Sequence, residues 1–116
     1  MRLRSLLPVV AASLALVVLA TASHAVDGNA AAALEEIGQV NGVALACNQP
    51  ALSSRARNAV ATGAPKTRDY GEIFEAATNA AFLNQGRGSA CPDAPTLSQQ
   101  LDQAEKRLRA AFPPAQ

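Results

Sequence analysis

The sequence predicts an all-α fold, a small three- to four-helix bundle stapled by one disulfide. Three observations lead to this prediction. Apolar residues recur at helical spacings of three and four through much of residues 30–112. No segment alternates polar and apolar residues as a half-buried strand does. The chain also has two cysteines, Cys47 and Cys91, which flank the middle of the helical region.

The N-terminal segment has the pattern of a secretory signal peptide over residues 1–25. Two arginines precede an uncharged run rich in Leu, Val and Ala, and small residues stand at Ser23 and Ala25. We expect cleavage after Ala25, with cleavage after Ala22 as the second choice and an uncleaved membrane anchor as the alternative. The protein is then periplasmic or secreted, and residues 26–116 form a single helical domain.

Removal of this segment changes the chemistry available to the chain. The single histidine, His24, and the single methionine leave with it, and tryptophan is absent from the whole sequence. A chain without histidine lacks the usual general base near neutral pH and the commonest metal and haem ligand. We therefore expect no enzyme activity, no metal and no cofactor. The remaining charge is close to zero, so nothing indicates nucleic acid, and we expect no stable membrane insertion after signal removal.

Cys47 and Cys91 are expected to pair. An even cysteine count in a short exported chain indicates a disulfide, and two cysteines allow one connectivity. The bond closes a loop of about 45 residues, which stabilises the fold by roughly 4 kcal/mol in the chain-entropy model. Two alternatives fit less well. A lipoprotein cleavage site at Cys47 lacks a hydrophobic lead-in, and a redox thiol pair lacks the CxxC spacing.

The first two helices are predicted over residues 30–48 and 51–62. Leu34, Ile37, Val40, Ala44 and Cys47 form the apolar stripe of the first helix. Gly38 and Gly42 lie four residues apart beside that stripe, so they permit a close helix crossing, mark a bend, or are tolerated in a frayed helix. Pro50 suits the first turn of the second helix, which Gly63 ends.

The third helix is predicted over residues 70–85 and is ended by Gly86. Asp69 and Glu72 form its start, a variant of the capping box. Its buried side is marked by Tyr70, Ile73, Phe74, Ala77 and Ala81, with Phe82 and Leu83 broadening that face. Thr78 and Asn79 interrupt the apolar stretch and make a buried polar position possible.

The last helix, residues 97–112, is the clearest in the chain. Thr96 and Gln99 form a second capping box. Five apolar residues alternate spacings of four and three along one face: Leu97, Leu101, Ala104, Leu108 and Phe112. Asp102 with Lys106 and Glu105 with Arg109 are opposite charges at i, i+4 on the exposed side.

A basic cluster is the candidate partner-binding site. Arg55, Arg57, Lys66 and Arg68 fall within fourteen residues, and Tyr70 follows them. Arginine forks match carboxylates and phosphates, and Tyr and Arg are enriched at contact hot spots. The alternative is an ordinary solvated helix face, because isolated surface charge is common.

In outline the chain resembles the small periplasmic helical proteins with one long-range disulfide, of which the acid-stress chaperone family of enteric bacteria is best known. The resemblance rests on the leader, the size, and the positions of Cys47 and Cys91 around the middle helices. It implies a helical periplasmic protein that acts by contact. We accordingly expect a non-catalytic protein whose partner is another periplasmic protein: a stress chaperone, an inhibitor or an accessory subunit. The alternative is a module that binds a small ligand or an anion.

Overall fold

Four helices, in a computed structural model that describes residues 26–114, confirm the predicted all-α bundle. They are α1 (Gly28–Ala46), α2 (Pro50–Gly63), α3 (Arg68–Gln85) and α4 (Ala94–Ala111). The predicted signal peptide lies outside the described residues. Each helix lies within three residues of its predicted bounds, and the largest difference is at the start of α4.

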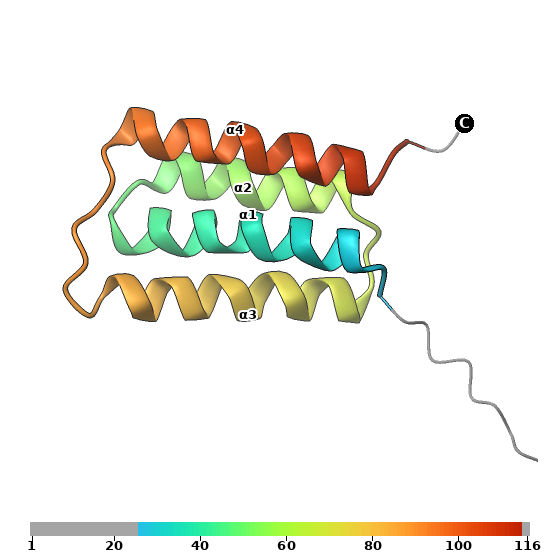
Figure 1. The fold of residues 1–116 in the computed structure, drawn as a ribbon, viewed down its shortest axis with the longest axis horizontal. Helices are drawn as coiled ribbons and strands as arrows, with labels where there is room; N and C mark the ends of the chain where they lie inside the picture. Colours follow the sequence, from blue (N-terminus) through green and yellow to red (C-terminus); the bar gives the residue numbers. More distant parts are fainter. Residues whose placement is uncertain (1–25, 115–116) are drawn as a thin grey trace, which may run out of the picture.

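The helix α1 is the centre of the arrangement (Figure 1). It packs against α2, α3 and α4, and α2 also packs against α4. The chain runs in the same direction along α1 and α3, and in the opposite direction along α2 and α4. Within residues 26–114 the backbone of α3 packs closely on α1 and on no other helix. The result is a three-helix core of α1, α2 and α4, with α3 attached to one flank of α1.

The core is built from medium-sized aliphatic side chains and alanine. Leu34 and Ile37 of α1 and Leu97, Leu101 and Leu108 of α4 are its largest fully buried members. The predicted stripe of α4 is therefore buried up to Leu108, whereas Phe112 is only partly buried at the end of the helix. On α3, Phe74 is the buried aromatic residue, and its neighbours on the predicted stripe are half-buried. Because each alanine buries little area, the core buries little apolar surface for helices of this length.

Gly38 and Gly42 bring the backbones of α1 and α3 together. A Cβ atom added at Gly42 would lie 2.8 Å from Ala81 Cβ, 2.9 Å from Phe82 N and within 3.0 Å of the Thr78 carbonyl oxygen. One added at Gly38 would lie 2.7 Å from Ala77 Cβ. Backbone atoms cannot move aside as a flexible side chain can. Of the explanations left open by the sequence, the close helix crossing is the one that the structure supports.

The helix caps differ from the predicted capping boxes. The Thr67 hydroxyl accepts a bond from Tyr70 N at 3.3 Å and caps α3, and Asp93 accepts from Thr96 N at 2.8 Å and caps α4. Both helices thus begin earlier than the predicted boxes, since Thr and Asp are themselves favourable N-caps. The bonds from Thr96 hold the pKa of the Asp93 carboxyl below its ordinary value of 3.8.

The reversal between α1 and α2 depends on Asn48. Its φ of 56° is in the left-handed region, which asparagine tolerates better than most residues. Asn48 N donates to Leu45 O at 3.4 Å and Gln49 N donates to Ala44 O at 2.8 Å, which is the bonding pattern of a Schellman motif. Pro50 then opens α2, as predicted. Cys47 is the C-cap residue of α1 and directly precedes Asn48 in this turn.

The predicted disulfide between Cys47 and Cys91 is confirmed, with the two Cα atoms 5.7 Å apart. It joins the end of α1 to the segment between α3 and α4, at the left in Figure 1. We refer to this end of the bundle as the stapled end.

Candidate functional site

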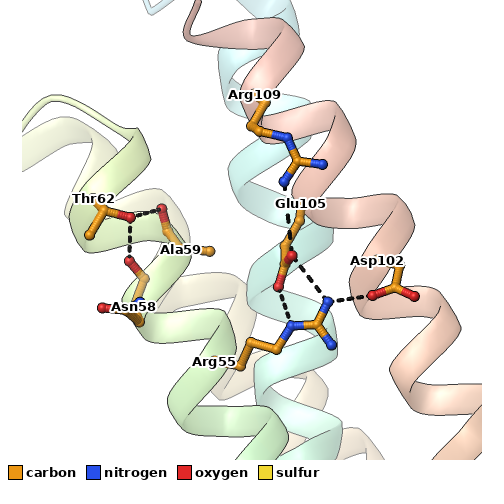
Figure 2. Close-up of polar contacts among 7 residues, drawn as sticks. All are labelled: Arg55, Asn58, Ala59, Thr62, Asp102, Glu105 and Arg109. Atoms are coloured by element: carbon orange, nitrogen blue, oxygen red, sulfur yellow. Dashed lines mark hydrogen bonds and ion pairs between the residues drawn. The ribbon is translucent and has the colours of Figure 1, made fainter. Parts of the chain in front are cut away.

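Arg55, the first member of the predicted basic cluster, is held against α4 (Figure 2). Its guanidinium forms ion pairs with Asp102 and Glu105; its Nε lies 2.7 Å from Glu105 Oε1, and its Nη2 donates to Glu105 Oε2 at 3.1 Å. Arg109 approaches the other side of Glu105 at 3.9 Å. The hydrogen bond that Arg55 donates to Glu105, followed by the one it donates to Asp102, raises the pKa of Arg55 above its ordinary value. Arg55 therefore links α2 to α4.

Sequence spacing alone could not identify these partners, because Asp102 lies 47 residues from Arg55. One of the two predicted pairs along α4 is present, between Glu105 and Arg109. Asp102, expected to pair with Lys106, contacts Arg55 instead. An arginine reaching two carboxylates on a neighbouring helix contributes to packing as well as to charge balance.

The other members of the cluster lie elsewhere. Arg57 is two residues beyond Arg55, on a different side of α2, since successive helical residues are separated by about 100°. Arg68 pairs with Glu72 at 2.8 Å, within α3. The Tyr70 ring meets the Phe112 ring edge to face, with centroids 5.1 Å apart. Lys66 is exposed in the loop before α3. Arg55, Arg68 and Tyr70 thus take part in separate contacts within the bundle, and a partner contact at the five residues stays a prediction.

A buried polar network connects three helices, and the sequence indicated only part of it. Asn41 of α1 donates from Nδ2 to Thr78 Oγ1 of α3 at 3.2 Å. Ser53 of α2 donates from Oγ to Asn41 Oδ1 at 2.6 Å. Thr78 in turn donates to Phe74 O at 2.9 Å. Of the two polar residues noted in the third helix, Thr78 is therefore the buried one, and Asn79 is exposed.

This network shows which side of α1 faces α2 and α3, and which side of α3 faces α1. Residues four apart on a helix share a side. Leu45 therefore follows Asn41 on the same side of α1, and Phe82 follows Thr78 on the same side of α3. Because the two helices run in the same direction, both residues lie near the stapled end.

Leu45, Phe82 and Leu83 form what we call the apolar end patch. They are the large hydrophobic residues exposed in the part of the chain that the structure describes, with 44%, 44% and 60% of their surface accessible. The expectation that Phe82 and Leu83 broaden the buried face of the third helix was wrong. The close crossing at Gly42 leaves no space between the two backbones for a phenylalanine ring, and no third helix covers this end of α3.

A second surface feature lies at the opposite end of the bundle. It is a shallow cleft of about 740 Å³ between the ends of α2 and α4. Pro65, Leu108, Phe112 and Pro113 supply apolar walls, and Arg109 reaches its rim. It offers modest apolar contact and one cation that already faces Glu105.

Over residues 26–114, no three His, Cys, Asp or Glu side chains are grouped so that they could hold a metal ion. None of the helices in that range combines the length and apolar character that a membrane span requires. In comparisons with known proteins, no family model, curated protein or solved structure matches this chain.

Proposed function

We propose that this is an exported, non-catalytic protein that binds another protein through the apolar end patch. The observation that carries the proposal is the exposure of Leu45, Phe82 and Leu83 in the last turns of α1 and α3, which end at the same side of the bundle (Figure 1). Single exposed apolar residues are ordinary on a protein surface, whereas adjacent large ones mark contact sites. The partner surface is expected to be apolar at its centre.

The surroundings of the patch suit a specific contact. Most of the binding energy of an interface comes from a few side chains near its centre. Phe82 and Leu83 project from a regular helix, and Leu45 precedes the Schellman turn at Asn48, so all three have well-defined positions before any partner arrives. Such preorganisation lowers the entropy cost of binding. The disulfide supports the proposed periplasmic or secreted location, because disulfides persist in oxidising compartments.

Site-specific photocrosslinking tests the proposal. A photoreactive amino acid at position 83 should yield one discrete crosslinked protein in the native host, to be identified by mass spectrometry. The same amino acid at exposed Ala61, on α2, should not. With the identified partner purified, Leu83→Asp should weaken binding by about tenfold or more, which corresponds to about 1.4 kcal/mol. Gln103→Asp, an exposed change on α4, is the matched control.

Equal crosslinking from positions 61 and 83, or undiminished binding by Leu83→Asp, would contradict the proposal. Circular dichroism of each variant controls for folding, because exposed substitutions rarely change stability by more than about 0.5 kcal/mol.

A small-ligand or anion-binding module is the second candidate, and the 740 Å³ cleft at the other end of the bundle is the observation in its favour. A ligand held there should raise the melting temperature in proportion to the logarithm of its concentration. Arg109→Met should abolish that rise and leave binding through the apolar end patch unchanged.

A further inference from the structure

The apolar end patch is made from two helices whose attachment to each other is uneven along their length. Leu45 belongs to the last turn of α1, whereas Phe82 and Leu83 belong to the last turn of α3. Within the described residues, α3 buries only Phe74 and Thr78, and both precede the patch. Beyond Thr78, the contact with α1 consists of small groups, chiefly Ala81 against Gly42. This part of the interface is close but buries no large apolar side chain, so it depends less on burial of apolar area than the contact at Phe74 does.

The disulfide fastens the same end. Cys47 directly follows α1, and Cys91 lies in the segment between α3 and α4. Gln85, the last residue of α3, donates from Nε2 to Ser89 O at 2.8 Å and lies 3.8 Å from Cys91 Sγ. The covalent bond therefore limits how far the end of α3 can move from the end of α1.

The opposite end of α3 is held by other contacts. The Tyr70 and Phe112 rings pack together there, and a short loop over residues 64–67 connects α2 to α3. Asn41 and Thr78 bond in the middle of the helix. Loss of the disulfide thus removes a restraint at one end of α3 and leaves those in the middle and at the other end in place.

We propose that the disulfide gates the apolar end patch, so that reduction by a dithiol of the thioredoxin type loosens residues 79–85 and separates Leu45 from Phe82 and Leu83. This inference rests on the protein-binding function proposed above and assigns a redox dependence to the same surface. The oxidised protein binds its partner, and the reduced protein binds it weakly.

The dithiol supplies the two electrons that reduction of the protein disulfide requires. Cys91 is exposed and Cys47 is half-buried, so a thiolate of the dithiol attacks Cys91 Sγ. The bond between the two cysteines breaks, and Cys47 leaves as a thiolate that takes a proton. The second thiol of the dithiol, as a thiolate, then attacks the mixed disulfide and releases Cys91 as a thiolate that takes up a proton. Two electrons pass to the protein disulfide, and the reductant ends as its own intramolecular disulfide.

Hydrogen exchange tests the loosening without any partner. Amides of residues 79–85 should exchange about tenfold faster or more after reduction with dithiothreitol, and in a Cys47→Ser/Cys91→Ser variant, while those of residues 97–108 in α4 keep their protection. Two results would overturn the inference: unchanged exchange in residues 79–85, or equal loss of protection in α4, which would mean global unfolding.

A binding measurement with the partner identified by crosslinking separates this inference from the proposed function. Reduction should weaken binding by about tenfold or more, the same scale as Leu83→Asp. If Leu83→Asp abolishes binding and reduction does not, the gating is wrong and the proposed function stands. If Leu83→Asp has no effect in the oxidised protein, the proposed function itself is wrong, whatever the exchange rates show.

Discussion

Replacing Gly42 by alanine should destabilise the protein, although alanine is the better helix former. The added Cβ would lie within 3.0 Å of the Thr78 carbonyl oxygen, Ala81 Cβ and Phe82 N, none of which can rotate away. Overpacking of this kind costs about 3 kcal/mol, and the gain in helix propensity returns about 1 kcal/mol. We expect the free energy of unfolding to fall by about 2 kcal/mol, which lowers the melting temperature by about 8–16 °C in a domain of this size.

Thermal and urea unfolding followed by far-UV circular dichroism measure this change. Gly71 provides the matched control, because it lies within α3 and a Cβ there would meet nothing within 4 Å. Gly71→Ala should therefore raise stability by up to about 1 kcal/mol. If Gly42→Ala stabilised the protein to the same extent as Gly71→Ala, α1 and α3 could not cross as closely as described.

Three further changes test other contacts. Asn41→Leu removes the acceptor of the buried Ser53 hydroxyl, so urea unfolding should show a loss of about 1–3 kcal/mol; a neutral result would remove the network from the list of stabilising contacts. Arg55→Met should cost about 0.5–1 kcal/mol at low salt and less in high salt, and a salt-independent loss would mean that packing dominates. Asp93→Ala should destabilise at neutral pH, because the lowered pKa shows that the native state favours the carboxylate. The difference in the free energy of unfolding between the native sequence and Asp93→Ala is fully present above pH 3.8, and it should vanish as the pH falls through the lower native pKa. A difference that persisted in acid would contradict the cap.

The helices and the disulfide could be predicted from the sequence because local patterns determine them. The stripe from Leu97 to Leu108 repeats at helical spacing, and two cysteines allow one pairing. The choice between Thr78 and Asn79 as the buried residue could not be made, because neighbouring positions differ by about 100° and the choice depends on where α1 lies. The exposure of Phe82 could not be predicted for a similar reason. The sequence shows that α3 has an apolar face, but it does not show how many helices cover that face.

The predicted basic cluster shows a second limit. Proximity along the chain placed Arg55 with Arg57, yet Arg55 contacts acidic residues of α4 and Arg57 lies on another side of α2. Only the long-range contact to Asp102 and Glu105 reveals that Arg55 links helices. The sequence of α4 did place two carboxylates three residues apart on its exposed side. Nothing in the local sequence indicates which cation pairs with them.

Tyr70, which packs edge to face on Phe112, is an intrinsic fluorescent probe of the bundle. The chain has no tryptophan and one tyrosine, so its intrinsic fluorescence comes from a single ring, at the end of α3 remote from the disulfide. Emission from that ring reports whether Tyr70 of α3 remains packed on Phe112, and no dye or introduced residue is needed. Motion confined to the end near Cys91 would leave the emission unchanged, whereas detachment of the whole helix would alter it.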